Sequence, residues 1–431
     1  MGLLLDSIYI GLSLLISPWI AYLVIFKKKF RQGIWDRLGF CSLTESQQET
    51  IWIHGSSVGE IMLLKPLISH LERELPGIPF VITAFTSTGK LAAQKSFPKH
   101  KVFSFPLDLS FIVNRYFRRL KPRLLIIFES EFWPNFICSA HAKKIPVVLL
   151  NGKMSEKSLS LYRKTLFFRR VLTKISVLAV QNEEYERRFR LLGIPESKIV
   201  TTGNMKYDLV FDHHNETKAF LRKKFGYPHK KLILIGGSTH SGEDEALMYA
   251  FSRLREEDCN LELIIVPRYP ENVTDIEKVV KGFQYVPLRK TFLDKQEIKS
   301  MDDFLNSVLI VDTIGELNSM YRIADIAYVG GSLFYRGSNK GGHNMVEPAI
   351  LGVAILFGPY NSAFRDTVND LMKAEAAIMV RDREELYSEL KELLRNPERV
   401  SRLGESARAV IENNQGATKR NLELLRPYLD P

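Results

Sequence analysis

The stretch IWIHGSSVGEIMLLKPLISHL, residues 51–71, passes from one kind of hydrophobic pattern directly into another. Its first residues form a short apolar run, as in a buried strand. Over residues 58–75 the apolar side chains, such as Ile61, Leu64 and Leu67, recur at the spacing of a helix face. Polar and glycine residues separate the two patterns. A strand, a polar turn and a helix in this order are the repeating unit of a parallel α/β sheet.

The same alternation continues along the chain in two series of apolar runs. The first series goes on with runs that begin at Phe80, Val102, Leu124 and Val147. After a polar passage near residues 208–230 a second series begins at Leu232, Leu261, Val308, Ile326, Ala354 and Ala377. Near-continuous hydrophobic strands that alternate with helices indicate parallel sheets covered on both faces. The sequence therefore predicts an α/β protein of two doubly wound, Rossmann-like domains that face a cleft.

The N-terminus predicts a membrane anchor. Residues 8–26 contain no charge, and Lys27, Lys28 and Lys29 follow at once. Such a run is near the minimum length for a membrane-spanning helix, and the lysines would keep the rest of the chain on the cytoplasmic side. A helix that lies in the headgroup layer and a buried core helix are the alternatives. We therefore expect an anchor over residues 1–28, a first domain over 29–207 and a second over 208–431, whose last helices can pack back on the first.

Charge and cysteine content narrow the function. Residues 1–205 carry a net charge of +14 and the remainder −3, so the first half should meet an acidic partner: nucleic acid, anionic lipid or a phosphorylated substrate. The three cysteines are far apart in sequence, which favours a reducing compartment. The sequence offers no clustered Asp-x-Asp motif, and no metal or other cofactor is expected. The aromatic residues are not interleaved with Lys and Arg as in RNA-binding proteins, which argues against nucleic acid.

Polar residues gather after the predicted strands, where ligands bind in open α/β sheets. The clusters are His54-Gly55-Ser56-Ser57, Glu129-Ser130-Glu131, Gly236-Gly237-Ser238-Thr239-His240, Arg268, Gly315-Glu316 and Gly330-Gly331-Ser332. None of the glycine turns completes the G-x-G-x-x-G pattern, so a dinucleotide site has little support. A further stretch, GGHNMVEPAILG at residues 341–352, places two glycines before a short helix with Glu347 in its first turn. These residues predict a ligand site along one edge of each sheet.

Nine motifs together resemble one family. They are RQGIWDRLGF, HGSSVGE, ESEFWPN, TTGNMKYD, GGSTHSGEDE, VPRYPEN, DTIGELNSMY, VGGS and GGHNMVEPAILG with FGP after it. With them the chain resembles the 3-deoxy-D-manno-octulosonic acid (Kdo) transferases of lipopolysaccharide synthesis, a GT-B glycosyltransferase family. The resemblance implies a CMP-Kdo donor and a phosphorylated lipid A precursor, lipid IVA, as acceptor. It also implies inversion of configuration without a metal, at the cytoplasmic face of the bacterial inner membrane.

The resemblance also implies roles for particular residues. Asp36 would be the catalytic base, although the family usually has Glu there, and Trp35 and Leu38 would give it an apolar setting. Glu131 and Lys206 would support the transition state. The donor residues would be Ser238, Thr239, His240, Pro267, Arg268, Gly315, Glu316, Leu317, Gly341, Gly342, His343, Asn344 and Glu347. The acceptor and cleft residues would be His54, Gly55, Ser56, Ser57, Gly59 and Glu60.

Two other functions are compatible with parts of the sequence. A transferase of the same fold that uses another nucleotide sugar, such as a UDP-sugar, would share the strand-end clusters. A basic, membrane-tethered binding module without catalysis would explain the charge of the first half, but it would leave the strand-end residues without a role. Stabilisation by UDP and not by CMP would favour the first of these alternatives.

Overall fold

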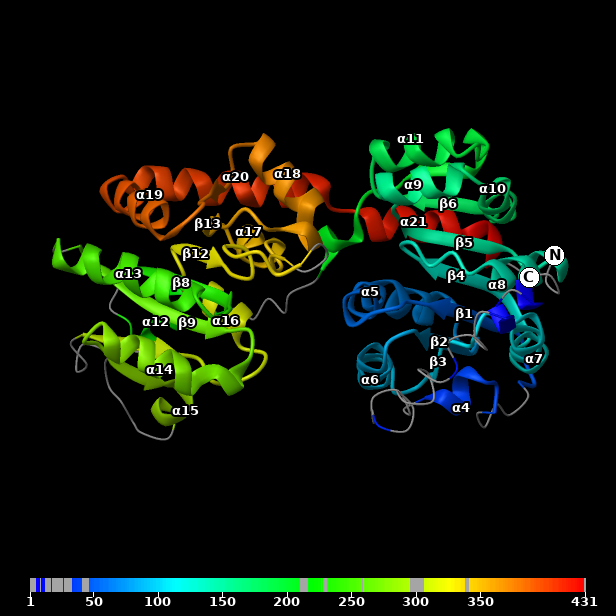
Figure 1. The fold of residues 1–431 in the computed structure, drawn as a ribbon, viewed down its shortest axis with the longest axis horizontal. Helices are drawn as coiled ribbons and strands as arrows, with labels where there is room; N and C mark the ends of the chain where they lie inside the picture. The colour runs from blue at the N-terminus through cyan, green and yellow to red at the C-terminus, as the bar shows by residue number, and fades with distance from the viewer. Residues whose placement is uncertain are drawn as a thin grey trace. The chain divides into compact units, whose positions relative to one another are not determined.

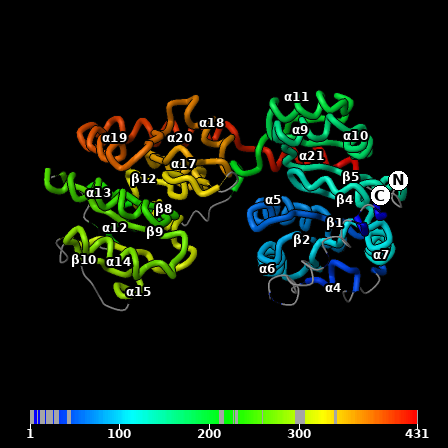
Figure 2. Tube along the Cα trace, viewed as in Figure 1, coloured from blue at the N-terminus to red at the C-terminus, as the bar shows by residue number. Residues whose placement is uncertain are grey.

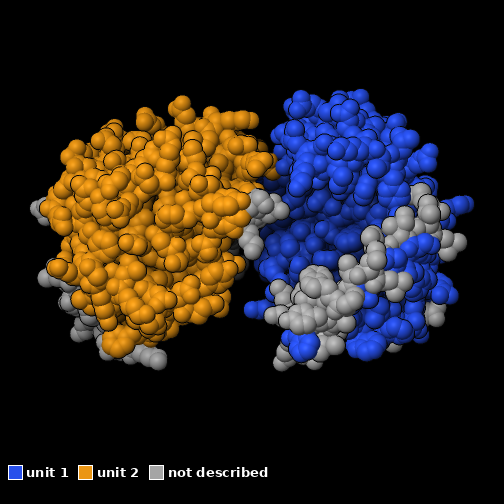
Figure 3. Space-filling view, in the orientation of Figure 1, with its two compact units in different colours: residues 1–209, 415–431 blue, residues 210–414 orange. Residues whose placement is uncertain are grey.

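The computed structural model describes residues 5–7, 9–11, 17, 26, 33–40, 46–209, 216–225, 227, 231–257, 259–294, 306–337 and 341–429. The chain forms two compact α/β units, each built on a parallel sheet (Figure 1). Unit 1 comprises residues 1–209 and 415–431, and unit 2 comprises residues 210–414 (Figure 3). The last helix of the chain therefore belongs to the first unit.

Unit 1 contains seven parallel strands in the order β3-β2-β1-β4-β5-β6-β7. The strands are β1 Thr50–His54, β2 Phe80–Ala84, β3 Lys101–Ser104, β4 Pro122–Phe128, β5 Val147–Gly152, β6 Val177–Val180 and β7 Ile199–Thr201. The helices are α4 Ile34–Arg37, α5 Val58–Glu74, α6 Ser87–Ser96, α7 Ser110–Leu120, α8 Pro134–Ala142, α9 Glu156–Arg163, α10 Leu166–Leu172, α11 Glu183–Leu191 and α21 Ala417–Leu425.

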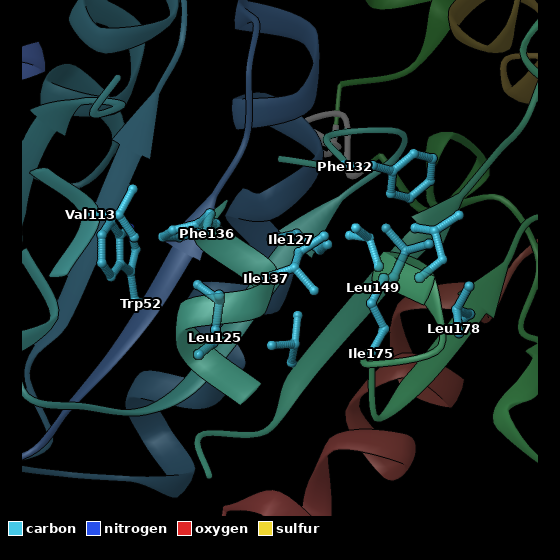
Figure 4. Close-up of a cluster of buried hydrophobic side chains, with 14 of the residues drawn as sticks. Trp52, Val113, Leu125, Ile127, Phe132, Phe136, Ile137, Leu149, Ile175 and Leu178 are labelled. Carbon is cyan, nitrogen blue, oxygen red and sulfur yellow. The ribbon is translucent and has the colours of Figure 1, made fainter. Parts of the chain in front are cut away.

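Each face of the unit 1 sheet has its own hydrophobic core. Successive strand residues point to opposite faces, so Ile51 and Ile53 pack with α5 and α21, whereas Trp52 packs with α7 and α8. Figure 4 shows the Trp52 side of the sheet, and the trace in Figure 2 shows α21 in red beside the strands of this unit. Strands buried on both faces explain why these sequence segments are continuously apolar.

Unit 2 repeats the plan with the strand order β10-β11-β9-β8-β12-β13-β14. The strands are β8 Leu232–Thr239, β9 Leu261–Pro267, β10 Val286–Arg289, β11 Ser307–Ile310, β12 Ile326–Val329, β13 Ala354–Phe357 and β14 Ile378–Met379. The helices are α12 Lys218–Lys224, α13 Glu243–Glu256, α14 Val273–Gly282, α15 Lys290–Leu293, α16 Leu317–Tyr321, α17 Val346–Ile350, α18 Arg365–Lys373, α19 Arg383–Arg395 and α20 Pro397–Asn414.

The predicted N-terminal anchor is not supported by the structure. Among the residues that the structure describes, no helix is long and apolar enough to cross a membrane. Most of residues 8–26, and all three of Lys27, Lys28 and Lys29, lie outside the described residues.

Candidate functional site

Each sheet has a pair of neighbouring strands whose following connections leave in opposite directions. In unit 1 this switch point lies between β1 and β4, and in unit 2 it lies between β8 and β12. Loops that leave the carboxyl ends of two such strands run in opposite directions and leave a crevice, where open α/β sheets bind their ligands. The ligand-binding residues of each unit are therefore expected around its switch point.

His54 and Glu131 meet across the switch point of unit 1. His54 ends β1 and is fully buried, and its Nε2 lies 3.3 Å from Oε2 of Glu131, which follows β4. The Nδ1 atom lies 3.1 Å from both the hydroxyl and the carbonyl oxygen of Thr83 at the end of β2. Since Nε2 faces a carboxylate, it must carry a proton to make this contact. The imidazole therefore holds Glu131 in one orientation.

A second donor, the Trp133 indole, also binds Glu131. Its Nε1–H donates to the same Oε2 at 2.9 Å. Burial raises the pKa of Glu131, but the hydrogen bond from His54, the charge of that ring and the bond from Trp133 outweigh burial and lower the pKa below the ordinary value. Glu131 is thus held as an anion, which suits a group that stabilises positive charge.

Glu60 and Glu129 complete an acidic cluster beside Glu131. Glu60 lies in the first turn of α5, where it accepts from Ser56 N at 2.8 Å and from Ser57 Oγ at 3.0 Å, and Ser57 in turn caps the helix. Burial, together with the charge of Glu129, raises the pKa of Glu60 to about 7. Glu129 has a backbone φ of 58° and forms an ion pair with Lys153.

The remaining predicted acceptor residues form the turn between β1 and α5. Gly55 N donates to Thr83 O at 3.1 Å, and Ser56 O accepts from Thr86 N at 3.0 Å, which ties the turn to the end of β2. Gly59 lies in the first turn of α5, one residue before Glu60. The structure therefore brings the whole predicted set from His54 to Glu60 to one edge of the sheet.

Asp36 lies in α4, and its carboxylate is engaged by two groups of unit 1. Its Oδ2 is ion-paired with Lys90 of α6 and accepts from Ser104 N at 3.2 Å. The expected apolar setting is wrong in part, because Trp35 is 66% exposed. Adjacent residues of a helix do not share a face, so Trp35 points away while Asp36 turns inward.

A row of stacked groups links α4 with the Glu131 cluster. The Arg37 guanidinium lies over the Phe85 ring at 4.8 Å, and its pKa is lowered, chiefly by burial. Phe85 stacks on Trp133 at 5.4 Å, and Trp133 donates to Glu131. Asp36 and Glu131 therefore belong to one packed layer along the edge of the sheet.

Lys206 lies in a short turn after β7, at the far end of this edge. Its backbone N–H donates to Asn204 Oδ1 at 3.0 Å, and the next residue back, Met205, donates its N–H to Asn151 Oδ1 at 3.0 Å. The turn that carries Lys206 is thereby fixed to β5, which ends beside Glu129. Lys206 itself is half-buried.

A buried carboxylate, Glu243, organises the switch point of unit 2. It is the first residue of α13 and only 1% exposed. It accepts five hydrogen bonds, from His240 N at 3.0 Å, Tyr328 Oη at 3.0 Å, Gly331 N at 2.7 Å, Ser332 N at 2.9 Å and Leu333 N at 2.9 Å. The amides of the glycine turn after β12 thus bind a side chain of the protein. Glu243 fixes the turns after β8 and β12 to each other.

Two predicted donor residues, His240 and His343, meet beside this turn. Their Nε2 atoms are 2.9 Å apart. The pKa of His343 is lowered to about 4 by burial and by the charges of His240, Arg268 and Arg336, and that of His240 is lowered by burial and the same arginines. Arg268 is exposed after β9, and its N–H donates to Thr239 O at 3.0 Å. This part of unit 2 is therefore electropositive.

Asn344 and Glu347 form a second pair of donor residues, at the start of α17. Asn344 Nδ2 donates to Glu347 Oε1 at 3.0 Å, and its Oδ1 accepts from Val346 N at 3.1 Å. Burial raises the pKa of Glu347, although the hydrogen bond from Asn344 opposes this shift.

Elsewhere at this switch point the Tyr321 hydroxyl lies against Gly237, where a Cβ would come within 2.0 Å of its oxygen. Gly237 therefore has to be glycine.

The other donor residues lie around these two pairs. Ser238, with φ 54°, and Thr239 end β8, and Pro267 ends β9. Gly341 and Gly342 approach the turn at 360–361 so closely that a Cβ on either would come within 2.6 Å of it. Glu316 is separately engaged with Thr313 and Lys290, next to Gly315 and Leu317. The structure thus groups the histidines with Arg268, and Asn344 with Glu347, but it gives Glu316 partners of its own.

Comparisons with known proteins identify the family. The family model described as 3-deoxy-D-manno-octulosonic-acid transferase (kdotransferase) matches residues 32–209. The 3-deoxy-D-manno-octulosonic acid transferase of Haemophilus influenzae is 32% identical over 435 residues, which cover 98% of each chain. The chain belongs to the Kdo transferase family. The relative of the same name from Chlamydia muridarum is 28% identical over 434 residues, 99% of this chain and 97% of the relative.

Solved structures with lower identity share the fold of this Kdo transferase family member. MurG of Acinetobacter baumannii is 17% identical with a TM-score of 0.55, and the match covers 88% of this chain and 99% of MurG. A glycosyltransferase from Rickettsia africae is 14% identical with a TM-score of 0.56, over 89% of this chain and 100% of that chain. These likenesses, with the two seven-stranded parallel sheets, confirm the predicted α/β fold of GT-B type.

Sequence reasoning missed two residues that matter in this Kdo transferase family member. Lys90 was not singled out because it lies in an ordinary helical pattern, 54 residues from Asp36. Glu243 lies within the motif GGSTHSGEDE, but no local pattern distinguishes it, since its partners include residues 85 to 90 positions further along the chain. Among the described residues, no group of three or more His, Cys, Asp or Glu side chains is placed to hold a metal ion.

Proposed function

We propose that the protein transfers Kdo from CMP-Kdo to the lipid A precursor lipid IVA, in one displacement that inverts the configuration and needs no metal. The observation that carries this proposal is the 32% identity to a Kdo transferase over 98% of both chains. The arrangement of polar groups supports it, because each unit gathers its polar residues at its own switch point.

Unit 2 would hold the donor. Glu347 and Asn344 are joined by a 3.0 Å hydrogen bond and present oxygens that suit the ribose hydroxyls of cytidine. Arg268 and Arg336 provide the positive surroundings that suit the phosphate and the Kdo carboxylate, and the His240–His343 pair lies in their field. The leaving group is a nucleoside monophosphate, whose growing negative charge these cations can stabilise.

Unit 1 would hold the acceptor and the catalytic base. Asp36 would take the proton of the attacking sugar hydroxyl, and the hydroxyl oxygen would bond to the anomeric carbon of Kdo as the bond to CMP breaks. Glu131, held as an anion by His54 and Trp133, would stabilise the oxocarbenium-like centre, and Lys206 would assist at the same site. The net charge of +14 over residues 1–205 suits an acceptor with two phosphates and an anionic inner-membrane surface on the cytoplasmic side.

The decisive experiment is a transfer assay with purified protein, lipid IVA and CMP-Kdo, in which mass spectrometry of the lipid reports each added Kdo. We expect a mass gain of one or more Kdo residues and release of CMP. An unchanged lipid in the presence of intact CMP-Kdo, together with thermal stabilisation by UDP and not by CMP, would instead support a transferase for another nucleotide sugar.

Calorimetric titration with CMP tests the donor site. Arg268→Ala and Glu347→Ala should weaken or abolish CMP binding, whereas Arg402→Ala, at an exposed position of α20, should bind as the wild type does. Unchanged CMP affinity in both donor-site variants would mean that the nucleotide binds elsewhere.

A further inference from the structure

The rings of His240 and His343 meet end to end. Their planes are inclined by only 4°, their centroids are 5.1 Å apart and their Nε2 atoms are 2.9 Å apart. Two rings in face-to-face contact could not combine this centroid separation with so short a nitrogen contact. The two imidazoles therefore lie nearly in one plane, with an N–H···N hydrogen bond between them.

This contact fixes the number of protons between the rings. Two bare nitrogens at 2.9 Å would repel each other, and two N–H groups would collide, so one proton lies between the Nε2 atoms. In the neutral pair, one of the two outer Nδ1 atoms carries a proton and the other does not. If the pair gains one proton, both Nδ1 atoms become donors while the central hydrogen bond is kept. A single added proton thus turns the pair into a cation with two outer donors.

The surroundings of the pair are positive and sterically fixed. Burial lowers the pKa of both histidines, and the charges of Arg268 and Arg336 lower it further. Glu243, which already accepts five hydrogen bonds, acts in the opposite direction on His240 alone. The Tyr269 ring is nearly perpendicular to the His240 ring, and the ring centroids are 5.5 Å apart. These are the charged and titratable groups that face the pair among the described residues.

The backbone turn after β12 supports the pair. A Cβ on Gly331 would lie 2.8 Å from Cδ2 and 2.9 Å from Nε2 of His343. Since Glu243 binds the Gly331 amide at 2.7 Å, the same carboxylate that fixes this turn also places the imidazoles. The pair is therefore a built feature of the switch point and not a chance contact of two surface side chains.

We propose that the His240–His343 pair takes up one proton from solvent when the anionic nucleotide donor binds, so that donor affinity is linked to pH. The inference rests on the donor site proposed above. In the empty site burial and the charges of the two arginines keep the pair neutral. A bound phosphate or carboxylate offsets that positive field and accepts from the outer N–H groups, which favours the protonated pair. Donor affinity should then fall as the pH rises, because the bound state holds a proton that the free state at higher pH lacks.

Calorimetric titration with CMP tests the linkage, using the whole protein in buffers that differ in ionisation enthalpy. The dependence of the binding heat on the buffer gives the number of protons taken up. His343→Gln keeps a side-chain group opposite His240 but cannot gain a proton, and any contribution from the CMP phosphate itself is the same in both proteins. His141→Gln, at an exposed position of unit 1, is the matched control.

We expect the wild type and His141→Gln to take up more protons than His343→Gln at neutral pH. Between pH 6 and 8 their CMP dissociation constant should rise relative to that of His343→Gln, by at most about tenfold per pH unit for one linked proton. Equal proton uptake and equal pH dependence in wild type and His343→Gln, with CMP bound by both, would overturn this inference alone. A wild-type protein that fails to bind CMP would overturn the proposed donor site as well.

Discussion

The Lys90 ammonium of α6 is ion-paired with the Asp36 carboxylate of α4, and both side chains are largely buried. In the proposed mechanism the base is therefore not an isolated carboxylate. The ammonium fixes its position, and it is also the group that an acceptor phosphate would approach. Binding of the phosphorylated lipid would then exchange the partner of Lys90 and leave Asp36 to accept the proton of the sugar hydroxyl.

This exchange predicts that Lys90→Gln impairs use of the acceptor. Loss of a charged hydrogen bond of about 1.5–3 kcal/mol should lower kcat/KM for lipid IVA by roughly tenfold to a hundredfold, with CMP affinity unchanged. Lys95→Gln, at an exposed position of the same helix, is the control and should behave as the wild type does. Steady-state kinetics with varied lipid IVA give the answer, and equal values for Lys90→Gln and Lys95→Gln would remove Lys90 from the acceptor site.

Substitutions of Asp36 test whether it is the catalytic base. Asp36→Asn should lower kcat by roughly a hundredfold to ten-thousandfold, the range for a positioned general base, while CMP binding stays intact. Asp36→Glu should retain much of the activity, since the resemblance implies Glu at this position. If the Asn variant turns over at the wild-type rate, the base has to be sought among Glu60, Glu129 and Glu131.

The hydrogen bonds that Glu243 accepts predict that even its replacement by Gln, which has nearly the same shape, lowers the free energy of unfolding. Glu243→Gln replaces one acceptor oxygen with an NH₂ group that faces N–H donors, so at least one buried amide loses its partner. We expect the free energy of unfolding to fall by about 1–3 kcal/mol in urea titrations. Glu245→Gln, two residues later and exposed, should leave it unchanged. Equal stability of the two variants would mean that the turn after β12 does not depend on the carboxylate.

The fold could be predicted from the sequence where the strands are buried on both faces and are therefore apolar throughout. Strands such as β1, β4 and β8 are buried on both faces and read as unbroken apolar runs. The edge strands β7 and β10 were missed, because each has a single buried residue and therefore lacks such a run. The buried strand β6 was also missed, and its length does not explain this, because the predicted strands β11, β12 and β13 are equally short.

The site could be predicted as a set of residues but not as a set of contacts. The topology rule places His54 and Glu131 on one edge, yet their hydrogen bond depends on the side-chain packing of Thr83 and Trp133. Pairings such as Asp36 with Lys90 join elements that are far apart in sequence, so no local pattern reveals them. What local spacing does specify is local chemistry, such as the Ser57–Glu60 capping box of α5.

Glu60 predicts a pH dependence of stability. An unfolded glutamate ionises near pH 4.3, whereas the folded pKa is raised to about 7. Between these values the folded state holds a proton that the unfolded state has released, so the contribution of Glu60 to stability is lost as the pH rises from about 4 to about 7. Glu60→Gln keeps the capping box and removes this titration. The variant should therefore gain on the order of 2–3 kcal/mol relative to wild type between pH 5 and 8.

Urea titrations at pH 5 and at pH 8 measure this gain in the free energy of unfolding. A constant offset between wild type and Glu60→Gln reports only lost contacts, so the change of the difference with pH is the readout. Glu183→Gln, an exposed acid in the first turn of α11, is the control. A difference that does not change with pH would show that Glu60 ionises alike in the folded and unfolded chains.

Asp6 predicts that the N-terminal segment stabilises unit 1. It is the single acid in a stretch expected to be an apolar anchor, yet it is only 6% exposed. Its Oδ1 accepts from Ser110 N at 2.9 Å and from Asn135 Nδ2 at 2.9 Å, and its Oδ2 accepts from the Ser110 hydroxyl. Helix α7 begins at Ser110, and its own N-cap residue, Leu109, offers no side-chain acceptor. A residue more than a hundred positions away in sequence therefore caps this helix.

Asp6→Ala should lower the free energy of unfolding of unit 1 by about 0.5–2 kcal/mol, the usual cost of removing an N-cap acceptor. Asp6→Asn should cost less, because its amide oxygen can still accept from the Ser110 N–H. Amide hydrogen exchange gives the local readout: protection of the first turn of α7 should fall in the Ala variant and not at α14 in unit 2. Unchanged exchange at α7 in Asp6→Ala would mean that this helix is capped without the N-terminal segment.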